Sequence, residues 1–133
     1  MQLTFALAAS LHVLSGVFWA GSNFAAARPS IAGERLFFPQ VIAALIAIVS
    51  GHFLWSSFHA GAFGPMERAL AIGAIGAILA LLVQLVLAGP VIVRLRRSAA
   101  GQQIPSARVK LSNRLAAGLL AVATIGMAVA RYA

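Results

Sequence analysis

Four long apolar stretches fill most of the chain, and each is long enough to cross a lipid bilayer as a helix. They cover about 3–27, 36–58, 69–93 and 111–130. A run of about 20 apolar residues spans the hydrocarbon core, and an α-helix satisfies its own backbone hydrogen bonds there. The pattern therefore predicts an all-α integral membrane bundle of four transmembrane helices, formed by a single domain over 1–133.

Turn-forming residues separate these stretches. Gly64-Pro65 marks the second connection, and the third contains glycine, two glutamines, proline and serine over 101–106. We expect Pro39 in the first turn of the second helix, where a missing N–H is tolerated. Pro90 is expected near the end of the third helix.

Basic residues gather at one end of the predicted bundle. Eight of the ten lie in or beside the first and third connections: Arg28, Arg35, Arg94, Arg96, Arg97, Arg108, Lys110 and Arg114. Only Arg68 and Arg131 belong to the opposite side. Because cytoplasmic loops are enriched in Lys and Arg, this distribution predicts cytoplasmic basic connections and two termini on the outer side. The apolar first stretch has no basic residue before it, so we expect it to be a helix rather than a cleaved signal.

The composition excludes several classes of chemistry. The chain is 62% hydrophobic and 9% charged, has a net charge of +8 and contains no cysteine. Disulfides, thiolate metal sites and iron–sulfur clusters are therefore excluded. Glu34 and Glu67 are the only acids, too few for a carboxylate cage around Ca²⁺ or Mg²⁺. Since the positive charges flank apolar segments, the expected partner is the lipid bilayer with its anionic headgroups, and no nucleic acid.

Two histidines, His12 and His52, are expected at the same depth in the membrane. His12 precedes Ala27 by 15 residues and His52 follows Leu36 by 16. At 1.5 Å per residue these separations are ~22 and ~24 Å along two helices that leave a common connection. His59, one heptad beyond His52, should lie on the same face about 10 Å further out. We interpret His59 as an interfacial polar residue and a less favoured metal ligand.

Two imidazoles at one depth on neighbouring helices can ligate a single haem iron. Small and aromatic residues accompany them on the same faces and could line a porphyrin: Ser15, Gly16, Trp19, Asn23, Trp55 and Ser56. Arg68 and Arg131 could pair with haem propionates. Each feature also has a plainer interpretation. A membrane histidine can bond a backbone carbonyl or a serine, tryptophans pack, and arginines at a membrane edge reach towards the headgroups.

The third helix carries a stripe of small residues, namely Gly73, Gly76, Ala77 and Ala80. Such a stripe lets helix backbones approach closely, either within the bundle or between protomers of a homo-oligomer. Gln84, on the same helix, is expected to be a buried amide that bonds across helices, with quinone or substrate binding as the less favoured role.

The stretch 11–21, LHVLSGVFWAG, resembles the first helix of small bacterial membrane proteins of the copper-resistance D (CopD) and HemJ-like group. In that group, a histidine early in the helix is followed by a tryptophan and a glycine. The last helix, with Arg108, Asn113 and the closing 130–132, is similar in style. The resemblance implies a four-helix b-type haem fold in the bacterial inner (plasma) membrane, with His12 as a haem ligand. The chain lacks the lysine and the Asn-Glu-Pro run of HemJ-type protoporphyrinogen oxidases, so that specific activity is not implied.

Zinc-protease, phosphate-loop and Ser-His-acid motifs are absent from the sequence, so any chemistry must come from a cofactor. The first hypothesis is a membrane haem b protein for electron transfer, with His12 and His52 as axial ligands. Its electron partner would be a quinone or a respiratory redox protein, and an oxidoreductase activity stays open. The alternatives are a non-enzymatic accessory or scaffold subunit, and a metal or small-solute carrier that uses His52 and His59.

Overall fold

The computed structural model describes residues 2–31, 33–58, 61, 63–98 and 107–133. Their regular structure is entirely helical: α1 (Gln2–Ala26), α2 (Gly33–Phe58), α3 (Pro65–Val83), the π-helix η1 (Gln84–Ala88), α4 (Gly89–Arg97) and α5 (Ala107–Ala130). Because α3, η1 and α4 follow one another without a break, they form one bent span of 33 residues. Four described spans are long and apolar enough to cross a membrane, so the predicted all-α membrane bundle is confirmed.

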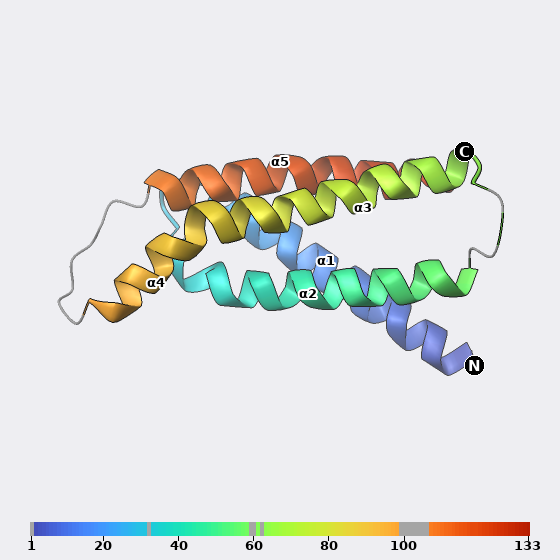
Figure 1. Ribbon diagram of the computed structural model, residues 1–133, viewed down its shortest axis with the longest axis horizontal. Coiled ribbons are helices and arrows are strands. Elements are labelled where there is room, and N and C mark those ends of the chain that lie inside the picture. The colour runs from blue at the N-terminus through green and yellow to red at the C-terminus, as the bar shows by residue number, and fades with distance from the viewer. Residues whose placement is uncertain (1, 32, 59–60, 62, 99–106) are drawn as a thin grey trace.

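The spans run up and down, and both termini lie at the same end of the bundle (Figure 1). The end of α1, the start of α2, the end of α4 and the start of α5 lie at the opposite end, which we call the basic end because eight of the ten cations of the chain are there. Helices α3 and α5 run side by side, whereas α1 crosses α2 at an angle (Figure 1). This arrangement agrees with the predicted topology, and the side of the membrane that each end faces stays a prediction.

Large apolar side chains cover the outside of the bundle, and small ones fill its centre. Val49 and Ile125, for example, are 68% and 62% exposed, whereas Ala44, Ala80 and Ala116 are fully buried. A soluble protein does not expose apolar surface on this scale, because water disfavours it. The distribution is that of a multi-pass membrane protein, in which lipid solvates the outer side chains and small residues let helices pack.

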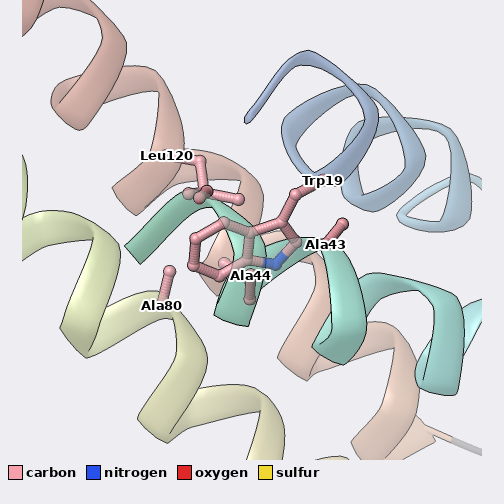
Figure 2. Close-up of a cluster of buried hydrophobic side chains, with 7 residues drawn as sticks. Trp19, Ala43, Ala44, Ala80 and Leu120 are labelled. Carbon is pink, nitrogen blue, oxygen red and sulfur yellow. The ribbon is translucent and has the colours of Figure 1, made fainter. Parts of the chain in front are cut away.

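One tryptophan occupies the centre of the bundle. The Trp19 ring of α1 lies among Ala43 and Ala44 of α2, Ala80 of α3 and Leu120 of α5 (Figure 2). The small alanine side chains leave the space that the indole fills, so this one side chain of α1 contacts the other three spans. Sequence reasoning left Trp19 open as a packing residue or a cofactor wall, and in this structure the ring is packed.

The small residues of α3 face α5 within the same chain. A Cβ at Gly73 would lie 3.0 Å from the carbonyl oxygen of Ala123, and one at Gly76 would lie 3.2 Å from that of Leu119. The two backbones therefore approach too closely for larger side chains. Of the two predicted uses of this stripe, packing within the bundle is the one that the structure shows, and a homo-oligomer stays a prediction.

Both interior prolines lie deeper in their helices than expected. Helix α2 begins at Gly33, so Pro39 lies in its second turn rather than its first. The third span starts at Pro65 and continues to Arg97, which places Pro90 well inside it. A proline has no N–H for the carbonyl four residues earlier, and its ring collides with that carbonyl. The π-helix η1 ends at Ala88, two residues before Pro90, and accommodates the conflict by widening the turn, as π-bulges do.

Candidate functional site

His12 of α1 lies against the backbone of α2. Its Nδ1 is 2.8 Å from the carbonyl oxygen of Ala47 and 3.5 Å from Oγ of Ser50. A carbonyl oxygen only accepts hydrogen bonds, so the Nδ1–H of His12 must be the donor to Ala47. In a neutral imidazole, Nε2 then carries no proton and keeps its lone pair.

Gly51 makes this close approach possible. A Cβ at Gly51 would lie 2.9 Å from Cε1 and 3.1 Å from Nδ1 of His12, well inside van der Waals contact. The imidazole therefore occupies the space that any other residue at this position would need. Because Gly51 directly precedes His52, the expectation that His12 and His52 share one depth is confirmed.

The two imidazoles do not face each other across the α1–α2 contact. His52 is exposed, whereas His12 is half-buried against the face of α2 that carries Ala47 and Gly51. One residue along a helix is a rotation of about 100°, so His52 leaves α2 in a different direction from that contact. His59 lies outside the described residues. The structure therefore matches the two histidines in depth but not in direction.

The other predicted cofactor residues are spread over the molecule. Ser15 is buried and its Oγ donates to the carbonyl of Leu11 in its own helix, while Gly16 has open space beside its Cα. Trp55 is half-buried, with its ring 6.5 Å from that of Phe63. The remaining predicted residues are exposed: Ser56, Arg68 and Arg131. They are not gathered around His12 in this structure.

A buried amide cluster lies nearer the basic end. We use this name for Trp19, Asn23, Gln40 and Gln84, each 0–1% exposed. Trp19 Nε1 donates to Gln84 Oε1 at 2.6 Å, and Gln84 Nε2 donates to Asn23 Oδ1 and to Gln40 Oε1, both at 2.9 Å. Asn23 Nδ2 donates to the carbonyl of Trp19. The cluster thus ties α1 and α2 to the first residue of η1.

One polar atom of the cluster is left over. Gln40 Nε2 is buried and has no hydrogen-bond partner among the described residues. Rotating the Gln40 amide would bring its NH₂ group against the Gln84 donor, so the present orientation is the better one. The predicted cross-helix bond of Gln84 is confirmed, whereas Gln40 was not anticipated. Depth arithmetic could have found it, because Asn23 lies four residues before Ala27 and Gln40 four after Leu36.

Among the described residues, no three His, Cys, Asp or Glu side chains come together in a group that could hold a metal ion. Comparisons with protein-family models, curated proteins and solved structures found no match for this chain. The structure thus defines a small multi-pass membrane protein, and its resemblance to the CopD and HemJ-like group stays a prediction.

Proposed function

We propose that this membrane protein binds a b-type haem for electron transfer, with His12 and His52 as axial ligands. The observation that carries the proposal is the hydrogen bond from Nδ1 of His12 to the carbonyl of Ala47. Metal-ligating histidines usually donate their second ring N–H to a carbonyl or carboxylate, which fixes the tautomer and the ring orientation. Nε2 of His12 is then the nitrogen that offers a lone pair to iron.

A haem with two imidazole ligands supplies one-electron oxidation and reduction and leaves no open iron position for a substrate. The role of the chain is to hold the His12 ring through Ala47 and Gly51 and to keep it in an apolar medium. Exposed Leu11 and Val13 beside His12 provide that apolar surface within the bilayer. The electron partner we propose is a quinone or a membrane redox protein, because both share the bilayer with the chain.

The position of His52 sets a structural condition on this proposal. His12 already packs on α2, so one macrocycle between α1 and α2 does not fit while both helices stay as they are. Ligation of one iron by both histidines would require α1 to shift against α2 and would break the His12–Ala47 hydrogen bond, so this structure supports His12 as a ligand more directly than His52.

The test is an absorption spectrum of the purified protein after expression with haem supplied. We expect a Soret band and a reduced α band that are lost in His12→Ala and in His52→Ala but kept in the matched control His59→Ala. Added imidazole should restore the bands of the His12→Ala protein, which separates loss of a ligand from misfolding. Wild-type protein that stays colourless, or bands that survive both ligand substitutions, would refute the proposal.

A non-enzymatic accessory or scaffold subunit is the second candidate function. The amide cluster favours it, because the central polar groups bond mainly to one another, as structural groups do. Colourless protein that co-purifies with a stoichiometric membrane partner would support this function. The carrier interpretation of His52 and His59 predicts instead a bound metal ion after mild purification, which elemental analysis detects.

A further inference from the structure

Two adjoining grooves follow the crossing of α1 and α2 on the outside of the bundle. The groove nearer the basic end has a volume of about 490 Å³, and its walls include Leu14, Phe18, Pro39 and Ile42. The second, of about 560 Å³, continues towards the termini past Leu7 and Phe53. Both are lined by Leu11 and Ile46, so together they form one apolar channel along the lipid-facing surface.

An arginine extends the line of this channel at the basic end. Arg35, Pro39, Ile42 and Ile46 succeed one another at steps of four, three and four residues, the spacing of one face of a helix. Side chains on a helix tilt towards its N-terminus, and the N-terminus of α2 lies at the basic end. The exposed guanidinium of Arg35 is therefore directed from the mouth of the channel towards the membrane surface.

A second arginine approaches the same place from α4. The guanidinium carbon of Arg96 lies 4.0 Å from the centroid of the Phe38 ring. Phe38 is three residues beyond Arg35 on α2, so the two are neighbours on the helix surface. A guanidinium stacked on a ring keeps its N–H groups at its edge free to donate. Arg35 and Arg96 thus both lie near Phe38, at the end of α2 from which the channel starts.

We infer that this place binds one anionic phospholipid, with an acyl chain in the channel and the phosphate between Arg35 and Arg96. The apolar channel suits the acyl chain of such a lipid. The arginines at the basic end suit its phosphate, because arginine N–H groups donate well to phosphate oxygens. The basic end carries eight cations and Glu34 as its single acid, so it favours a lipid with net negative charge. The inference does not depend on haem binding.

The test is native mass spectrometry of the full-length protein in detergent, titrated with phosphatidylglycerol or with phosphatidylcholine. Wild type should retain one phosphatidylglycerol more tightly than any phosphatidylcholine. Arg35→Gln with Arg96→Gln should weaken this binding about 30-fold, which corresponds to about 1 kcal/mol for each arginine. Arg94→Gln with Arg97→Gln is the matched control. It removes two exposed charges from the same end, and these residues lie on the side of α4 away from buried Ile92.

A third variant tests the channel separately from the charges. Ile42→Trp fills the channel and leaves both arginines in place, and we expect it to reduce phosphatidylglycerol binding at least tenfold. Equal losses in the two arginine pairs would mean diffuse attraction to the basic end and would overturn the inference. So would equal retention of the two lipids by wild type, or full binding by Ile42→Trp.

Discussion

Replacing Gln84 with leucine should destabilise the bundle more than any lipid-facing substitution. Leucine has nearly the same size as glutamine, so the change creates little empty space. It removes a side chain that bonds to three other side chains, Trp19, Asn23 and Gln40. The indole N–H and two amide oxygens are then left buried without their partner.

The magnitude follows from the number of lost bonds. Interhelical hydrogen bonds in membrane proteins contribute about 0.6 kcal/mol on average and up to about 1.7 kcal/mol, since the unfolded chain in a micelle also finds partners. Three bonds therefore give an expected loss of about 2–5 kcal/mol in the free energy of unfolding. Adding Gln40→Leu to Gln84→Leu should recover part of this loss, because it removes one of the orphaned oxygens and the unpaired Nε2.

Equilibrium unfolding in SDS mixed micelles, followed by circular dichroism, measures this difference. In a Trp55→Phe background Trp19 is the single tryptophan, so its fluorescence reports the same transition at the cluster itself. Leu85→Ala is the control, because Leu85 lies in the same π-helix but is 42% exposed to lipid. We expect that control to change stability by less than about 1 kcal/mol. A Gln84→Leu protein that unfolds at the same SDS fraction as wild type would show that the cluster does not stabilise the fold.

Three glycine substitutions test the close contacts. Gly73→Val should cost about 1–3 kcal/mol in the SDS assay, because the new side chain meets the Ala123 carbonyl and must push α3 from α5; unchanged unfolding would argue against this contact. Gly118→Ala should leave stability unchanged or raise it by up to about 1 kcal/mol, since its Cβ meets open space and alanine favours the helix; a loss of stability would show that the space beside Gly118 is not open. Gly51→Ala should displace the His12 ring and, in haem-loaded protein, lower the Soret absorbance with both histidines still present; an unaltered spectrum would disprove the role assigned to Gly51.

The fold could be predicted largely from apolar length, because lipid allows few structures for a long apolar run. The helix at 36–58 was placed within three residues at its start and matched at its end. The common depth of His12 and His52 could also be predicted, because residue positions on two helices that leave the same connection can be counted from the same level. The bend at 84–88 could not be predicted in this way. Pro90 signals a perturbation, but whether the chain kinks, ends or widens depends on the packing around it.

The direction in which each histidine side chain points was harder to predict than its depth in the membrane. Helical periodicity placed His12 on the same face of α1 as Ser15, Trp19 and Asn23, but α1 crosses α2, so the neighbour of that face changes along the helix (Figure 1). His52 consequently lies at the predicted level and turns away from His12. The amide cluster was only partly predicted, because the depth arithmetic was applied to the histidines and not to Asn23 and Gln40, which both bond to Gln84.

Because of the π-helix, the number of residues in the segment 84–88, rather than their identity, determines the direction in which the basic side chains of α4 point. A π turn holds about one residue more than an α turn, so η1 rotates all that follows by about 100° relative to a continuous α-helix. That rotation buries Ile92 and brings Arg96 over Phe38. A homologue could exchange most residues of 84–88 and keep this alignment, whereas loss of a single residue there would turn Arg96 away from α2. Insertions and deletions in this segment should therefore be rarer than substitutions.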